Sequence, residues 1–107
     1  MQAVSLGEEA DGTLVLTLCG ELDFTNAGTV AAVIREAVAG HRPPAVRIDV
    51  AGVGFLDSSG VGVLVQGLQS AEEVAARFAV VNPGDKVYDQ LRISGLLELF
   101  NVSGAPG

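Results

Sequence analysis

The alternation of apolar and polar residues divides the chain into short strands and longer helices. Residues 3–9 and 13–19 alternate as strands do, and the Asp-Gly pair in the segment Ala10-Asp11-Gly12 between them is typical of a hairpin. Val46, Ile48 and Val50 alternate with charged residues and predict a third strand, and residues 78–81 predict a fourth. Because both faces of residues 14–19 are fairly apolar, we expect that strand to be central in the sheet.

Three segments have the spacing of amphipathic helices. The first covers residues 27–39, with Asn26 as its cap and Gly40 as its stop; its predicted buried stripe is Val30, Val33, Ile34, Ala37 and Val38. The second covers residues 59–75, with a stripe of Val61, Leu64, Val65 and Leu68. The third is predicted to begin at Asn82-Pro83, with Pro at the first helical position, and to end near Ser94-Gly95.

The order of these elements predicts an α/β fold. We expect a mixed sheet of four to five strands with three to four helices packed on one face, joined by right-handed crossovers. Residues 96–102 are expected to add a last turn and a short strand, and residues 103–107 a loose tail. With 107 residues the chain is predicted to be a single domain, 1–107, with an ordered core of about 3–102.

Composition and charge narrow the classes of function. No apolar run approaches the roughly 20 residues of a spanning helix, and no basic, apolar leader is present, so we expect a cytoplasmic protein with no membrane partner. The net charge is −7 and the six basic residues are scattered, which argues against nucleic acid. The acidic balance fits either a protein partner with a basic surface or a role in solubility alone. A monomer is the expectation. Cys19, the only cysteine, is expected to be a small buried side chain.

The segment Asp57-Ser58-Ser59-Gly60 lies where a strand end turns into a helix, but it matches no catalytic motif. Neither serine has glycines on both sides in the Gly-x-Ser-x-Gly pattern, and the only histidine, His41, lies in a distant Pro-rich connector. No Lys occurs between residues 1 and 85, which excludes a P-loop there. We therefore expect no enzymatic activity, no cofactor and no metal.

Helix capping explains only part of this segment. Asp57 and Ser58 are favoured N-cap residues, which accounts for one hydrogen bond worth about 1 kcal/mol. It does not account for Gly60 and Gly62, each of which lowers helix propensity by about 1 kcal/mol relative to Ala. Such residues favour a helix start that another surface approaches closely.

The chain resembles the bacterial STAS-domain anti-sigma factor antagonists from about Val4 to Val102. The most specific match is Phe55-Leu56-Asp57-Ser58-Ser59-Gly60-Val61-Gly62-Val63-Leu64, the second is Gly20-Glu21-Leu22-Asp23, and the weakest is Val80-Val81-Asn82-Pro83 with Ser94-Gly95-Leu96. The resemblance implies a protein that binds an anti-sigma factor and thereby releases a sigma factor.

The resemblance also implies a phosphorylation switch. In the family the anti-sigma factor is a serine kinase that modifies the serine after the motif's aspartate, here Ser58, and a metal-dependent serine phosphatase removes the phosphate. The phosphorylated antagonist no longer binds. Asp23, Asp57, Ser58, Ser59, Gly60 and Gly62 match family positions at the partner contact.

Two other interpretations remain open at this point. One is a STAS module that is never phosphorylated and serves as a scaffold or regulatory subunit of a transporter or stress-sensing complex. The other is a module that binds a nucleotide or another small anion at the helix N-terminus.

Overall fold

A computed structural model describes residues 4–104. Its elements follow the order β1 (Val4–Glu8), β2 (Leu14–Cys19), α1 (Ala27–His41), β3 (Ala45–Gly52), α2 (Ser58–Glu73), β4 (Arg77–Val81) and α3 (Asp85–Ile93). The four strands form one sheet in the order β1-β2-β3-β4. β1 is antiparallel to β2, and the other neighbours are parallel. The predicted mixed sheet, with β2 inside it, is confirmed.

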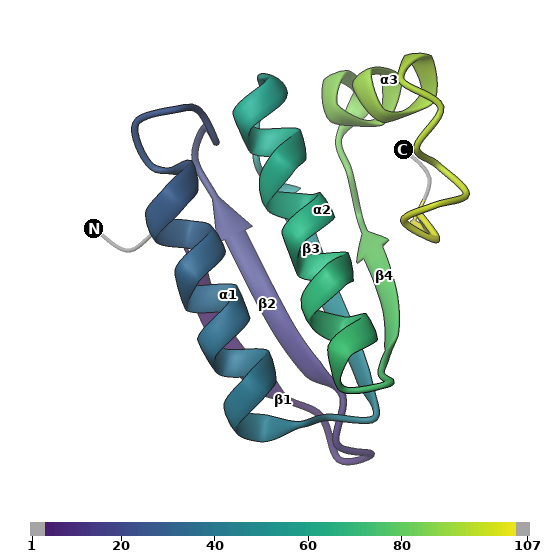
Figure 1. Ribbon diagram of the computed structural model, residues 1–107. Helices are drawn as coiled ribbons and strands as arrows, with labels where there is room; N and C mark the ends of the chain where they lie inside the picture. Colours follow the sequence, from purple (N-terminus) through teal and green to yellow (C-terminus); the bar gives the residue numbers. More distant parts are fainter. Residues whose placement is uncertain (1–3, 105–107) are drawn as a thin grey trace.

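α1 and α2 lie side by side across one face of the sheet, and α3 lies at the end of the sheet where β4 stops (Figure 1). The inward-facing side chains of β2 and β3 pack against α1 and α2. Leu16, Leu18, Ile48 and Val50 are completely buried, and Phe100 from the C-terminal segment stacks edge-on against Phe78 at 6.2 Å between ring centres. The last turn expected in residues 96–102 forms, but the strand pairing lies one residue later. Ser103, which was predicted to begin the loose tail, forms a parallel bridge with Val81 because its N–H donates to Val80 O and its O accepts from Asn82 N–H. Residues 3 and 105–107 of the predicted core and tail lie outside the described residues.

The hairpin between β1 and β2 forms as predicted. Gly12 adopts a φ of +91°, and Thr13 N–H donates to the Asp11 carboxylate at 2.9 Å. This bond and that from Gly12 N–H to Glu9 O fix the turn. The Thr13 N–H bond also lowers the pKa of Asp11 below its usual value.

The buried face of α2 differs from the prediction. The residues that are buried are Gly60, Val63, Leu64, Gly67, Ser70 and Ala71, whereas Val61, Val65 and Leu68 are only partly covered. The reason is the close contact that glycine allows. A Cβ on Gly67 would lie 2.7 Å from Ile48 Cδ1, so α2 rests on the sheet along its smallest residues. Leu64 was predicted correctly, but the spacing of apolar side chains does not reveal the glycines and Ala71 that share its face.

Several predicted helix boundaries were wrong: α2 covers Ser58–Glu73 instead of 59–75, and α1 and α3 also differ. α1 passes Gly40 and ends at His41, because Arg42 takes the left-handed position with a φ of 44° and donates its N–H to Val38 O at 2.9 Å. α3 begins at Asp85, not at Pro83, because Asn82 is tied to the sheet: its N–H donates to Ser103 O and its side chain to Asp49. The left-handed C′ position at Gly95 was predicted correctly, with a φ of +73°.

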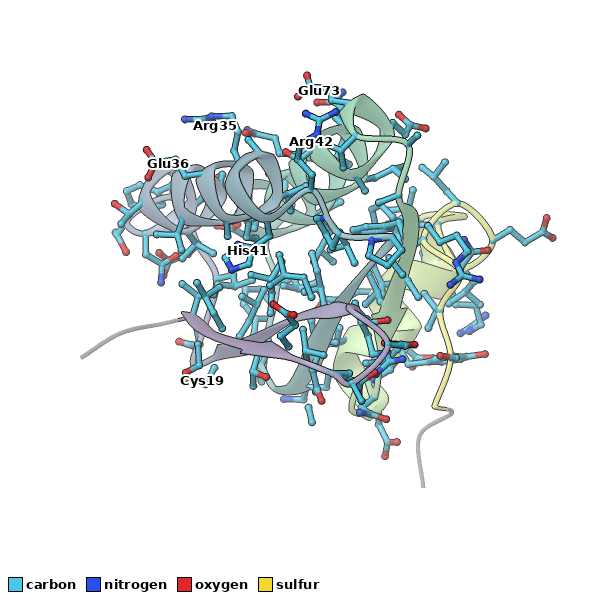
Figure 2. The ribbon with its side chains drawn as sticks, turned by 90° about the horizontal axis from the view of Figure 1, so that it is seen from below. Cys19, Arg35, Glu36, His41, Arg42 and Glu73 are labelled. Atoms are coloured by element: carbon cyan, nitrogen blue, oxygen red, sulfur yellow. The ribbon has the colours of Figure 1, made fainter. Side chains whose placement is uncertain are left out.

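Cys19 was predicted to be buried and is exposed. It lies on the side of the sheet away from the helices, where side chains of β2 face solvent (Figure 2). Figure 2 also places Arg35 and Arg42 with Glu36 and Glu73 on the helical layer, so charges of both signs are mixed there. Within residues 4–104, none of the helices has the length and apolarity needed to cross a membrane.

Candidate functional site

The site lies at the edge of the sheet where β2 and β3 end and α1 and α2 begin (Figure 1). The loops that follow the two strands are joined by a parallel bridge between Leu22 and Leu56, both completely buried. Leu22 N–H donates to Phe55 O, and Asp57 N–H donates to Leu22 O, each at 3.4 Å. The bridge therefore places Asp23 and Asp57, which follow the bridged residues, on neighbouring segments of the same edge.

Asp57 caps α2 through its side chain. Its backbone is extended, and its carboxylate accepts the Gly60 N–H at 3.0 Å, as the capping prediction required. Ser58 is the first helical residue and is exposed. Among residues 4–104, no group forms a hydrogen bond with the hydroxyl or the N–H of Ser58 or Ser59. The expected exposure of Ser58 is confirmed, and its hydroxyl is available to an external enzyme.

The two glycines at the start of α2 have different surroundings. A Cβ on Gly60 would lie 2.7 Å from Leu22 O and 3.0 Å from Leu56 Cδ2, so Gly60 allows α2 to touch the bridged loops. A Cβ on Gly62 would meet nothing within 4 Å. The close approach that the sequence predicted occurs within the molecule at Gly60, while the space beside Gly62 is open.

Asp23 is held by its own loop. Its carboxylate accepts from the N–H of Thr25 at 2.9 Å and from the Thr25 hydroxyl. The hydroxyl bond, followed by the N–H bond, lowers the pKa of Asp23 below its usual value. Asn26 occupies the cap position of α1 but does not cap the helix with its side chain, contrary to the prediction. Its side chain accepts from Asp23 N–H at 3.1 Å and donates to Glu21 O at 2.9 Å, which fixes the loop from within.

α3 completes the site from the other side. Leu56 N–H donates to the Gln90 side chain at 3.2 Å, and the Gln90 amide donates back to Leu56 O. This clamp sets α3 beside the start of α2 and leaves an open groove of about 510 Å³ between them, whose lining includes Phe55, Ser58, Val61 and Ile93. Sequence reasoning missed Gln90 and the groove, because residues 34 positions apart meet only in the fold.

The only histidine lies apart from Ser58. His41 lies at the end of α1, whereas Ser58 lies at the beginning of α2, and these points are at opposite ends of the helical layer (Figure 1). The His41 ring contacts Ala37 O through Nδ1 at 2.9 Å. In the part of the chain from 4 to 104, no three His, Cys, Asp or Glu side chains gather as metal ligands would.

Comparison with known proteins relates this geometry to one family. Residues 7–105 match the STAS domain family. An anti-sigma F factor antagonist of Lysinibacillus sphaericus is 32% identical over 84 residues, which are 78% of this chain and 72% of the relative. The solved structure of the anti-sigma factor antagonist SpoIIAA in its unphosphorylated form is similar with a TM-score of 0.79 and 29% identity, over 96% of this chain and 88% of that one. The Bacillus protein SpoIIAA in its phosphorylated form gives a TM-score of 0.72 and 28% identity, over 96% and 91% of the two chains.

Proposed function

This chain belongs to the STAS domain family, and we propose that it is an anti-sigma factor antagonist controlled by phosphorylation of Ser58. The relatives named as antagonists support the first part, and they are regulatory proteins, not enzymes. The observation that carries the second part is the exposed Ser58 hydroxyl, which has no hydrogen-bond partner within residues 4–104. A similar structure in a phosphorylated form is consistent with it.

In this proposal the chain supplies only the nucleophile. A serine kinase, which is the anti-sigma factor itself, holds ATP, and the Ser58 oxygen attacks the γ-phosphorus. The bond from that phosphorus to the ADP oxygen breaks, and the hydroxyl proton passes to a base of the kinase. A metal-dependent serine phosphatase returns the hydroxyl by adding water and releasing inorganic phosphate.

The switch follows from charge and burial. A phosphate adds about −1.5 to −2 charges and three acceptor oxygens. In a docked interface this group is desolvated without full compensation, at a cost of several kcal/mol. Moving a complex from mostly bound to mostly free takes roughly 5 kcal/mol of differential affinity, which is in the same range.

The residues at partner-contact positions divide into two groups. Ser58 and Gly62 have open surroundings, and we assign them to direct contact. Gly60 packs against the Leu22 carbonyl, and the Asp23 carboxylate is bound by Thr25. We therefore assign these two residues to positioning the neighbouring contact residues. Asp57 contributes the cap and a negative charge beside the modified residue.

The adjacent serines provide a matched test. Purified serine kinases of the anti-sigma class from the source genome are incubated with ATP and wild type, Ser58→Ala or Ser59→Ala, and mass spectrometry locates the phosphate. We expect one phosphate on wild type and on Ser59→Ala, and none on Ser58→Ala. Phosphate on Ser59 would contradict the assignment. Binding without modification would favour the scaffold function, and a melting shift caused by nucleotide alone would favour small-molecule binding.

Calorimetry then tests the switch. We expect Ser58→Ala to bind the kinase as tightly as wild type, and Ser58→Asp to bind at least about tenfold more weakly, a difference of about 1.4 kcal/mol. Equal affinities for wild type and Ser58→Asp would reject control by this residue.

A further inference from the structure

We propose that the anti-sigma factor docks on an apolar surface that Ser58 interrupts, formed by Phe24, Phe55, Ser58 and Ile93 and called here the Ser58 surface. The inference rests on the proposed function and names the chemistry of its contact. It predicts that the phosphate weakens binding because it holds water where an apolar contact would form. It also predicts that Phe24 and Ile93 contribute most of the contact with the partner.

Exposed apolar side chains concentrate at this edge of the molecule. Five large apolar residues are exposed within residues 4–104, and three of them are Phe24, at 80%, Ile93, at 75%, and Phe55, at 46%. The loop that contains Phe24, the start of α2 and α3 all lie along the same end of the fold (Figure 1). Exposed aromatic and aliphatic groups at one edge are typical of a protein contact.

The apolar groups stand on fixed backbone. Phe24 lies within the loop that Asp23, Thr25 and Asn26 tie together. Phe55 precedes the residue that Gln90 clamps, and Ile93 is in the last turn of the same α3. Because the supporting backbone is ordered before binding, less conformational entropy is lost in the complex. A large exposed ring on an ordered loop is characteristic of an interface anchor.

Charge identifies the partner's chemistry. Glu21 and Asp57 flank the surface, and no Lys or Arg occurs in residues 20–34 or 48–76. Arg92, which precedes Ile93 in α3, is paired with Asp89 at 3.2 Å, so its charge is offset within the helix. The complementary surface is therefore apolar at its centre and carries Arg or Lys at its rim. A second copy of this chain is a poor match, because it would bring the same carboxylates together.

The position of Ser58 explains how phosphate would break this contact. Ser58 and Ile93 line the same groove between α2 and α3. A dianion on that wall binds water strongly, and an apolar side chain of the partner that entered the groove would have to displace this water. Release of the partner then requires no change in the fold.

The test uses a kinase that phosphorylates Ser58 in the experiment above. Its dissociation constant is measured for wild type, Phe24→Ala, Ile93→Ala and Leu6→Ala, with thermal unfolding to confirm that each is folded. Leu6 is the matched control, an apolar residue that is 50% exposed on β1. We expect Kd to rise at least about tenfold for Phe24→Ala and for Ile93→Ala, and less than about twofold for Leu6→Ala.

The outcomes separate the two proposals. If wild type binds the kinase and Ser58→Asp does not, but Phe24→Ala and Ile93→Ala bind as wild type does, the apolar contact is refuted and the function stands. If no kinase binds wild type, both fall. Analytical ultracentrifugation tests whether a second copy of this chain binds the Ser58 surface instead. If wild type is a dimer, Ile93→Ala is a monomer and both bind the kinase equally, the surface serves self-association and the inference is overturned.

Discussion

The same substitution at two glycines of α2 should have opposite effects on stability. In Gly60→Ala the new Cβ would lie 2.7 Å from Leu22 O and 3.0 Å from Leu22 Cβ. The obstacle at Gly60 is a backbone carbonyl held in the bridge to residues 55–57, so it cannot rotate away as a side chain could. In Gly62→Ala the Cβ meets nothing within 4 Å.

The magnitudes follow from two competing terms. Replacing Gly by Ala within a helix gains about 1 kcal/mol of helix propensity. Forcing a methyl group into a filled site costs about 1–3 kcal/mol. Because the Leu22 carbonyl beside Gly60 cannot move away, we expect a cost toward the upper end of that range. We therefore expect Gly60→Ala to lower the free energy of unfolding by about 1–2 kcal/mol and Gly62→Ala to raise it by about 0.5–1 kcal/mol.

Urea and thermal unfolding measure both changes. One kcal/mol corresponds to about 4–8 °C in a domain of this size, so Tm should fall for Gly60→Ala and rise for Gly62→Ala. Each variant is the other's control, because both change the same residue type in the same helix. If Gly60→Ala were as stable as Gly62→Ala, the close packing of α2 against the Leu22 carbonyl would be wrong.

Two further substitutions test the supports of the site. Asp57→Ala removes the side chain that accepts Gly60 N–H, and it should destabilise the protein by about 1 kcal/mol in urea unfolding; an unchanged midpoint would mean that the cap contributes nothing. Gln90→Leu leaves the N–H and carbonyl of buried Leu56 without the clamp, and it should cost about 1–3 kcal/mol. The control is Asp89→Ala, at the exposed residue next to Gln90, which should change stability by less than about 0.5 kcal/mol. If Gln90→Leu and Asp89→Ala had equal effects, the clamp would not be a stabilising contact.

Local signals in the sequence predicted the parts of the fold that depend on local chemistry. The Asp11-Gly12 turn, the cap at Asp57 and the left-handed Gly95 each follow from one or two residues, and all were correct. Two local signals failed, the cap at Asn26 and the stop at Gly40. Other errors arose where contacts between distant residues decide the structure. α2 lies on the sheet along Gly60 and Gly67 because Leu22 and Ile48 approach there, and these contacts are not visible from the spacing of apolar side chains in the helix.

The candidate site also contains residues that the sequence reveals and residues that only the fold reveals. Ser58 could be located from its motif and its place before an apolar helix, and the structure confirms that it is exposed. Phe24 and Ile93 could not be distinguished from core residues in the sequence, because an isolated apolar residue beside a strand or in a helix is usually buried. Only the assembled fold places Ile93 in the same groove as Ser58 and leaves Phe24 exposed on the loop at the same end of the molecule (Figure 1).

The place of Ser58 in the helix also explains how modification could change binding and leave the fold intact. The N–H groups of Ser58 and Ser59 have no acceptor within residues 4–104, and they lie at the positive end of the α2 dipole. A phosphate on Ser58 gains those donors, a contribution of about 0.3–1 kcal/mol at an exposed site, which offsets its repulsion by Asp57. In the free protein the two charge effects are therefore of similar size and opposite sign. In the proposed complex the same phosphate would lose water against an apolar partner, a cost several times larger, so the modification would act on the complex and not on the folded state.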